Sequence, residues 1–208
     1  VSEPGKEIIE SDVVRVIEAA KAISLAPARR IIHVLPRSFT VDSQEGIKDP
    51  VGMSGVRLEV DTHLVTGGMT SLKNLEKCVS TVVIDVDGLV FSGFASAESI
   101  LTETEKELGV ILLDIGAGTT DIAIYADGAL SYSSVLPVGA RHVTNDLAIG
   151  LRVSLESAEK IKIFLGKADK KMVHPETTDK KKKPDDDMME VTELGLSEDL
   201  KAVSRKTL

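Results

Sequence analysis

The sequence predicts an α/β fold that carries an additional α+β subdomain. Two observations lead to this prediction. Residues 110–138 have the pattern of three short strands separated by two tight turns, and residues 11–80 have the pattern of a helix, two strands and a second helix. With 208 residues, 42% of them apolar, the chain can bury a substantial core in one or two domains.

The first predicted helix lies near the N-terminus. Ser11 and Asp12 are typical helix-capping residues, and Pro27 marks the end of the pattern. The apolar residues in between recur at helical spacing, so we expect them to face a core. They are Val13, Val14, Ile17 and Ala20.

Two strands and a second helix follow. Residues 31–41 and 56–65 have strand composition, and the glycine- and proline-rich segment 46–55 joins them as a loop. Residues 69–80 return to helical spacing, which completes a small α+β layer. The single cysteine, Cys78, falls on this helix, and we expect it to pack in the core, because a lone thiol cannot form an internal disulfide.

Segments 82–84 and 89–94 have extended patterns, and residues 95–108 are predicted to form one helix. Two further helices are predicted over residues 145–151 and 155–165. Between these helical regions lies the part of the chain that carries the strongest functional signal.

This central part has a strand–turn–strand pattern. Residues 110–113 and 121–126 are the predicted strands, and the segment 115–120 is the turn between them. Asp127-Gly128 is a strong hairpin signal, after which residues 129–138 resume an extended pattern. The three strands are therefore expected to pair antiparallel.

The glycines of this turn predict a phosphate site. A dinucleotide-binding turn leads from a strand into a helix, whereas this turn leads into another strand. Gly116 and Gly118 can adopt backbone angles that other residues avoid, and they let successive N–H groups point at an anion. Thr119 and Thr120 add hydroxyl donors.

Two carboxylates border the turn. Asp114 ends the first strand and can hold a magnesium ion through water, while Asp121 can brace the turn. A plain hairpin turn with a solvated acid at the strand end explains the same glycines equally well. The residues alone therefore leave both interpretations open.

A wider resemblance favours the phosphate site. The octet DIGAGTTD, residues 114–121, resembles the second phosphate motif of the actin-like ATPase superfamily. Residues 33–67, 94–110 and 135–151 are similar to FtsA, a bacterial cell-division family of that superfamily. The resemblance covers most of residues 30–165. It implies a partial FtsA chain with an actin-like (ribonuclease-H-like) fold and an SHS2-type 1C subdomain.

The resemblance also implies a domain organisation. Residues 1–82 correspond to subdomain 1C, and residues 83–108 to the return strand and helix of subdomain 1A. Residues 109–166 correspond to the start of subdomain 2A with the phosphate hairpin, and residues 167–208 to a polar loop and the start of subdomain 2B. The charged run Lys180–Asp187 is interpreted as a flexible polar loop.

In this superfamily ATP lies with magnesium between two lobes. By resemblance, a glycine turn at residue 139 approaches the nucleotide, and Ala140 stands where the family has a second glycine. The implied cofactor site comprises Asp114, Gly116, Ala117, Gly118, Thr119, Thr120, Asp121 and Gly139, with Asp114 holding magnesium through water. The opposing phosphate loop is not among these residues, so we expect them to bind ATP weakly or not at all by themselves.

No catalytic residue is assigned. The position that orients the attacking water in the superfamily corresponds to Ser92 and Gly93, and neither is a general base at neutral pH. The resemblance therefore implies at most a weak ATPase. Two other functions of the superfamily remain as alternatives: a pilus-assembly-type adaptor and a small-molecule kinase.

The resemblance implies partners and a location as well. They are FtsZ and other division proteins, further copies of the protein in filaments, and the inner face of the cell membrane at the division site, reached from the cytoplasm through a C-terminal helix outside these residues. A formal net charge of −8 argues against nucleic-acid binding. No apolar run approaches the length that spans a bilayer.

Overall fold

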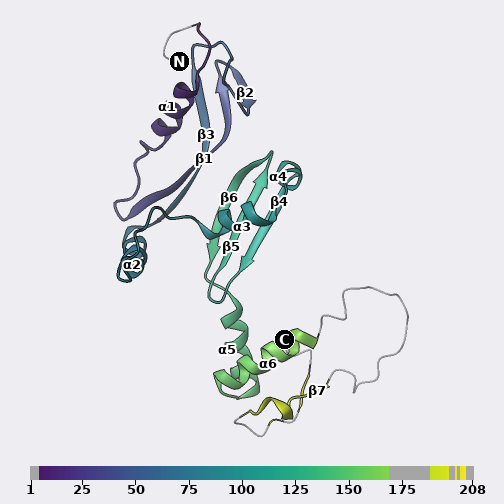
Figure 1. The fold of residues 1–208 in the computed structure, drawn as a ribbon. Coiled ribbons are helices and arrows are strands. Elements are labelled where there is room, and N and C mark those ends of the chain that lie inside the picture. Colours follow the sequence, from purple (N-terminus) through teal and green to yellow (C-terminus); the bar gives the residue numbers. More distant parts are fainter. Residues whose placement is uncertain (1–4, 169–187, 197–199, 201, 205–208) are drawn as a thin grey trace, which may run out of the picture. The chain divides into compact units, whose positions relative to one another are not determined.

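The computed structural model describes residues 5–168, 188–196, 200 and 202–204 (Figure 1). The chain forms two compact units. The first unit comprises Val1–Asp114 and Asp121–Leu136, and the second comprises Ile115–Thr120 and Pro137–Leu208. Within the described ranges, every helix is too short or too polar to cross a membrane.

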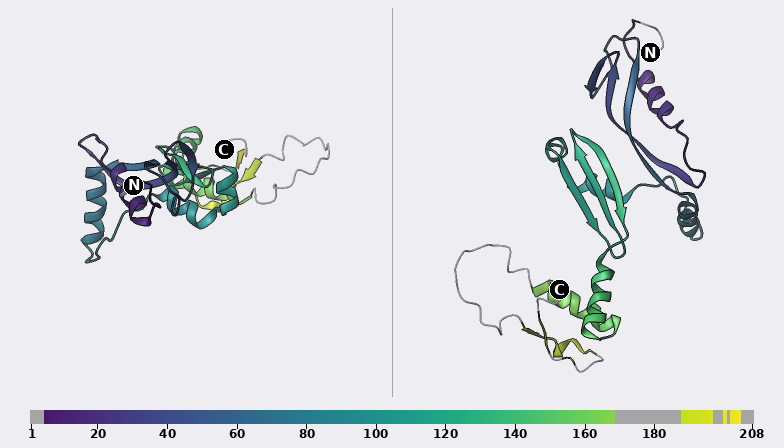
Figure 2. Two further views of the ribbon diagram at one scale, coloured as in Figure 1. Left: turned by 90° about the horizontal axis from the view of Figure 1, so that it is seen from above. Right: turned by 180° about the vertical axis from the view of Figure 1, so that it is seen from behind.

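The first unit begins with a helix beside an antiparallel sheet. Helix α1 (Glu10–Ala20) lies alongside β1 (Arg29–Val41) and β3 (Leu58–Gly68), as Figure 2 shows from behind. Strand β2 (Gln44–Ile47) pairs with the other edge of β1, which gives the order β2-β1-β3. Strand β2 was not predicted, because its polar residues and its glycine have little preference for strands.

The start of α1 differs from the predicted cap. Helix α1 begins at Glu10, and Asp12 lies in its first turn, where its carboxylate accepts a hydrogen bond from the backbone N–H of Ile9. Asp12 is therefore buried, while Ser11 is exposed. In the predicted apolar stripe, Val14 is exposed, whereas the other three residues are partly buried.

Helix α2 (Met69–Ser80) has the predicted bounds. The prediction for Cys78 is wrong, because its thiol is exposed. The physical reason is that α2 follows directly from the end of β3 and buries none of its residues. The regular apolar spacing predicted that this segment is a helix, but it did not predict how much of the helix is buried.

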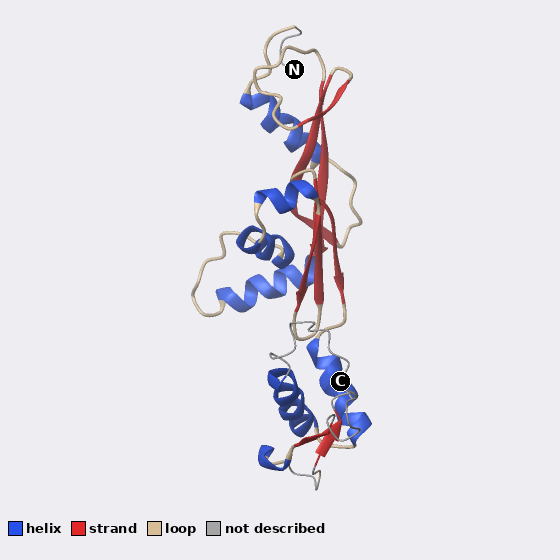
Figure 3. Cartoon of the chain, turned by 90° about the vertical axis from the view of Figure 1, so that its right-hand side faces the viewer, coloured by secondary structure: helices blue, strands red, loops and turns tan. Residues whose placement is uncertain are grey.

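A second sheet completes the first unit. Strands β4 (Val110–Ile115), β5 (Thr120–Ala126) and β6 (Ala129–Leu136) follow one another in chain order, as predicted. Helix α3 (Ser92–Ile100) covers one face of this sheet. The core between them contains Ala97, Leu112, Ala123, Tyr125 and Leu130. Figure 3 shows the helices of this unit on one side of the strands.

The predicted helix over residues 95–108 is two helices. Helix α3 begins at Ser92, inside the segment predicted to be extended, and α4 spans Glu103–Leu108. Thr102 caps α4: its hydroxyl accepts a hydrogen bond from the N–H of Glu105, whose carboxylate accepts one from the N–H of Thr102. Residues 82–91 join neither sheet, so the expected return strand is not formed there.

The second unit is built on two packed helices. Helix α5 (Ala140–Leu151) begins earlier than predicted, and α6 (Leu155–Ala168) follows after a left-handed turn at Arg152. The hydroxyl of Ser154 accepts a hydrogen bond from the N–H of Ser157 at 3.2 Å and so caps the start of α6.

Short elements near the C-terminus cover α6. They are β7 (Met188–Glu190), the 3-10 helix η3 (Thr192–Leu194) and β8 (Ala202–Ser204), and β7 pairs with β8. Their shared core contains Ile161, Leu165, Val191 and Val203. The charged run Lys180–Asp187 lies outside the described residues.

Candidate functional site

The glycine turn is a tight hairpin loop. The N–H of Gly116 donates a hydrogen bond to the carbonyl of Thr119 at 2.9 Å, so Ala117 and Gly118 form the tip of the loop between β4 and β5. Both tip residues and Thr119 are exposed. The predicted strand–turn–strand arrangement is confirmed.

The backbone angles of the glycines were predicted wrongly. Neither Gly116 nor Gly118 has a left-handed φ angle. A Cβ atom on Gly116 would lie 3.1 Å from the carbonyl oxygen of Thr119, whereas one on Gly118 would meet nothing within 4 Å. The fold therefore needs no glycine at position 118, and open space lies beside that residue.

The turn rests on the first turn of α5. The N–H groups of Ala140 and Arg141 donate hydrogen bonds to the carbonyls of Gly116 and Ala117, at 2.9 and 2.8 Å. Gly139 is buried below the turn, and a Cβ atom there would lie 2.6 Å from the carbonyl oxygen of Gly116. Only glycine permits this close approach.

The two threonines of the motif differ in their surroundings. Thr120 donates its hydroxyl proton to the carbonyl of Val138 at 2.7 Å, so that donor is already used within the fold. Thr119 is exposed, and no hydrogen bond in the described part of the chain engages its hydroxyl. Thr119 is therefore the hydroxyl of the pair that can donate to a ligand.

The two aspartates of the octet bind residues of α3 in the first unit. Asp114 is half-buried, and its carboxylate accepts a hydrogen bond from the hydroxyl of Ser96 at 2.9 Å. Asp121 accepts one from the hydroxyl of Ser92. In the portion that the structure describes, no three His, Cys, Asp or Glu side chains gather as a metal site.

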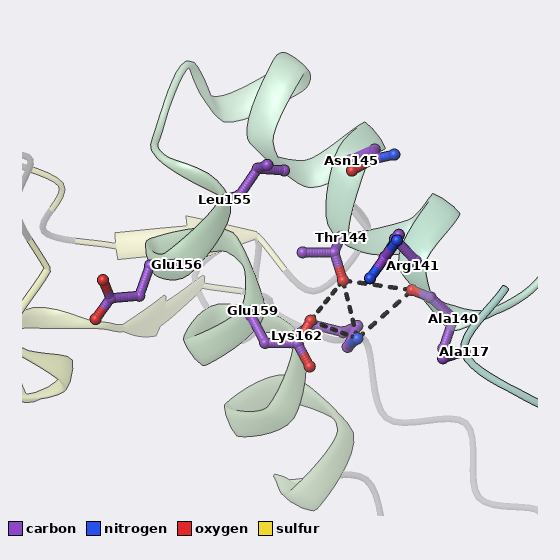
Figure 4. A pocket seen from close by; sticks show the side chains of 9 residues that line it. All are labelled: Ala117, Ala140, Arg141, Thr144, Asn145, Leu155, Glu156, Glu159 and Lys162. Atoms are coloured by element: carbon purple, nitrogen blue, oxygen red, sulfur yellow. Dashed lines mark hydrogen bonds and ion pairs between the residues drawn. The ribbon is translucent and has the colours of Figure 1, made fainter. Parts of the chain in front are cut away.

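A cavity of about 540 Å³ lies in the second unit beside the turn (Figure 4). At its centre the ammonium of Lys162 lies 2.7 Å from Glu159 Oε2 and 2.9 Å from Thr144 Oγ1. Thr144 Oγ1 also lies 2.6 Å from Glu159 Oε2. The lining residues are Ala117, Ala140, Arg141, Thr144, Asn145, Leu155, Glu156, Glu159 and Lys162.

The carboxylate of Glu159 is held in its charged form. The hydrogen bond from Lys162, and then the one from Thr144, lower the pKa of Glu159. No pattern in the sequence predicted this group of three residues. Glu159 and Lys162 are one helical turn apart on α6, a spacing that also describes ordinary surface ion pairs. Only the packing of α5 on α6 brings Thr144 within hydrogen-bond distance of both.

The structure thus gathers most predicted site residues in the second unit. The hairpin turn is joined by hydrogen bonds to the start of α5 and to the residue before Gly139. The predicted site residues in this part of the chain are Gly116, Ala117, Gly118, Thr119, Thr120 and Gly139. Asp114 and Asp121 border this segment in sequence and belong to the first unit.

Two family models match the sequence. Residues 1–66 match the model of the SHS2 domain inserted in FtsA, and residues 111–198 match the model of the cell division protein FtsA. Together these two matches span more than half of the chain.

Curated cell division proteins named FtsA are similar over most of this chain. Identity is 46% over 158 residues for the Pseudomonas aeruginosa protein, covering 76% of this chain and 38% of that protein. It is 43% over 162 residues for the Neisseria meningitidis protein (78% and 39%) and 43% over 161 residues for the Escherichia coli K12 protein (77% and 38%). The chain spans about two fifths of the length of these relatives.

Among solved structures, a PilM–PilN type IV pilus biogenesis complex is similar in fold. The match has a TM-score of 0.52 at 15% identity and covers 79% of this chain and 47% of that one. This likeness bears on the fold alone. With the family models, it confirms the predicted actin-like α/β fold with an SHS2-type subdomain. The sequence matches go further, because two FtsA models and relatives above 40% identity agree: the chain belongs to the FtsA family.

Proposed function

We propose that this chain is part of an actin-like ATP-binding cell-division protein, in which residues 116–119 hold the phosphates. One observation carries the proposal. The tip of the turn is exposed, and no hydrogen bond of the described residues engages the N–H groups of Ala117 and Gly118. Consecutive backbone donors in such a turn form an anion site, and the exposed hydroxyl of Thr119 adds a third donor.

The aspartates have supporting roles in this proposal. Asp114 directly precedes the turn in sequence and holds magnesium through water, since carboxylates bind this ion while it keeps most of its own water. Its hydrogen bond from Ser96 fixes the carboxylate and leaves its other oxygen for the water. Asp121 braces the start of α3 through Ser92.

The cavity beside the turn takes the nucleoside. Its volume of about 540 Å³ falls within the usual range of small-molecule sites. Ala117 belongs both to the turn and to the cavity wall, so a ligand whose phosphates lie on the turn reaches this cavity. Glu159 and Asn145 supply polar groups for hydroxyls and ring nitrogens.

The function of the whole protein is proposed by family. It polymerises into filaments and links the FtsZ ring to the membrane at the division site, with ATP and magnesium as a switch between polymer states. Residues 1–82 supply a subunit or division-protein contact as subdomain 1C. Hydrolysis is at most slow, because Ser92 and Gly93 offer no general base.

A pilus-assembly-type adaptor is the second candidate. The fold likeness to the PilM–PilN complex favours it, yet identity there is 15% against 46% for a curated FtsA. Co-sedimentation of a full-length protein carrying these residues with FtsZ and lipid vesicles, with and without ATP, separates the two. Pelleting with FtsZ supports the division protein, and its absence supports the adaptor.

The phosphate site is tested with Gly118→Ala in the same full-length protein. A methyl group at this position meets open space in the fold, so the free energy of unfolding should stay within about 0.5 kcal/mol. It occupies the place of the phosphates, so ATP affinity measured by calorimetry should fall about tenfold or more. Gly150→Ala, also beside open space, is the matched control. Equal affinity of both variants would contradict the assignment.

Magnesium binding is tested with Asp114→Asn. The amide keeps an acceptor for Ser96 but loses the charge. We expect the magnesium-dependent part of ATP affinity to disappear while binding without magnesium stays the same. A variant that still responds fully to magnesium would refute the role of Asp114.

A further inference from the structure

The carbonyl groups of the turn and its N–H groups cannot be oriented independently. The carbonyl of Gly116 and the N–H of Ala117 belong to one planar trans peptide unit, so they point in opposite directions. The same holds for the carbonyl of Ala117 and the N–H of Gly118. Because α5 binds both carbonyls, both N–H groups point away from α5.

We propose that the first turn of α5 orients the phosphate-binding N–H groups of the turn, and that Thr120 and Gly139 are positioning residues for it. This inference rests on the proposed function and adds to it. Binding of the two carbonyls by Ala140 and Arg141 holds the anion site in its binding form before any ligand arrives. Such preorganisation favours affinity, since no ordering cost remains.

The donors of α5 explain why the anion binds at the turn. The first N–H groups of a helix usually have no partner in the helix and are free to bind anions. Here the N–H groups of Ala140 and Arg141 already bind the carbonyls of the turn. The helix therefore acts on a phosphate through the turn, and it does not bind the phosphate with these two groups.

Thr120 and Gly139 stabilise the contact between the turn and α5 in two different ways. The hydroxyl of Thr120 binds the carbonyl of Val138, which fixes the chain just before α5. Gly139 lets the backbone of the turn come close, since a Cβ atom there would lie 2.8 Å from the carbonyl oxygen of Ala117. Neither residue needs to contact the ligand in order to affect its binding.

Amide hydrogen exchange by NMR in the full-length protein gives the first test. Without nucleotide, the amides of Ala140 and Arg141 should exchange slowly, although first-turn amides normally exchange fast. The amides of Ala117 and Gly118 should exchange fast and become protected when ATP and magnesium are added. Fast exchange at Ala140 and Arg141 would overturn the proposal.

Variants of Thr120 give the second test. Thr120→Val keeps the shape of the side chain and removes the hydroxyl, whereas Thr120→Ser keeps the hydroxyl. We expect the valine variant to speed exchange at Ala140 and Arg141 and to weaken ATP binding about threefold to tenfold. The serine variant should restore both. A valine variant with unchanged exchange and affinity would overturn the role of Thr120.

Gly139→Ala provides an independent variant, with Gly150→Ala on the same helix as its control. Only the change at residue 139 should displace the turn and release its two hydrogen bonds. The two proposals fail in different ways. If the wild-type protein does not bind ATP, the proposed function is wrong, and the exchange rates still decide how α5 and the turn are joined. If ATP binds but neither variant changes exchange or affinity, only the role of α5 is wrong.

Discussion

The ammonium group of Lys106 lies 2.9 Å from Glu98 Oε1, and Lys106 is only 5% exposed. A second carboxylate, that of Glu103, is 3.1 Å away, and the ring centroid of Tyr125 is 5.7 Å away. The hydrogen bond to Glu98 is the main cause that raises the pKa of Lys106, although burial acts in the opposite direction. Through this lysine α4 is tied to α3 and to the sheet.

The pair of Lys106 and Glu98 should contribute to stability. A double-mutant cycle with Lys106→Met and Glu98→Gln, measured by urea unfolding, should give a coupling energy of about 1 kcal/mol. The exposed pair of Lys160 and Glu156 is the control, for which we expect at most about 0.5 kcal/mol. Because the pKa of Lys106 is raised, the stability that depends on the proton of Lys106 is fully present below pH 10.5 and is lost as the pH rises through the folded value. Equal coupling energies in the two pairs would contradict the prediction for Lys106 and Glu98.

Two histidines should make the first unit sensitive to acid. Burial lowers the pKa of His33, and burial together with the charge of Arg37 lowers that of His63. The unfolded chain then takes up protons more readily, so both histidines stabilise the fold fully above about pH 6.5 and lose this effect as the pH falls through their folded pKa values. His33 Nε2 accepts a hydrogen bond from the N–H of Phe91, which a protonated ring cannot do.

The variant His33→Gln isolates one of these contributions, since glutamine accepts the same hydrogen bond and does not titrate. The free energy of unfolding should depend less on pH below about 6.5 than in the wild type, by at most about 1.4 kcal/mol per pH unit. Urea unfolding at several pH values measures this. An unchanged pH dependence would show that His33 is protonated in the folded state as readily as in the unfolded one.

The hairpin between β5 and β6 should depend on its glycine. Asp127 and Gly128 both have left-handed φ angles, 53° and 77°, which are typical of the two-residue turn that joins antiparallel strands. Gly128→Ala should destabilise the fold by about 1 kcal/mol, because a β-carbon disfavours this conformation. Asp127→Asn should be neutral, since asparagine tolerates it. Thermal or urea unfolding of the two variants tests the difference.

The charge of Glu159 should depend on Lys162 more than on Thr144. The hydrogen bond from Lys162 is the larger cause of the lowered pKa of Glu159. In an NMR titration, Lys162→Met should therefore raise this pKa further than Thr144→Val does. Because the pKa is lowered, Glu159 adds stability above its unfolded value of about 4.5 that is lost as the pH falls through the folded value. A larger rise in the pKa of Glu159 with Thr144→Val than with Lys162→Met would contradict this prediction.

The sequence predicted the turn because its signals are local. Apolar strands on both sides of Gly116 and Gly118, and the pair Asp127-Gly128, depend on residues a few positions apart. The break between α3 and α4 was also present in the sequence as the capping box of Thr102 and Glu105, which the prediction of one helix over residues 95–108 overlooked.

Other features depend on contacts between distant segments. The hydrogen bonds from α5 to the turn join residues more than 20 positions apart, and their donors are backbone groups that every residue has. No pattern of residue types in the sequence predicts such contacts. The same holds for Thr144, which meets Glu159 and Lys162 only because α5 packs on α6.

The exposure of Cys78 has a practical consequence. It is the single cysteine among the 208 residues, and it lies on the surface of α2. A maleimide dye should therefore label these residues at one position under native conditions, on a helix of the first unit. The same thiol calls for a reductant during purification, because two exposed cysteines from different molecules can crosslink.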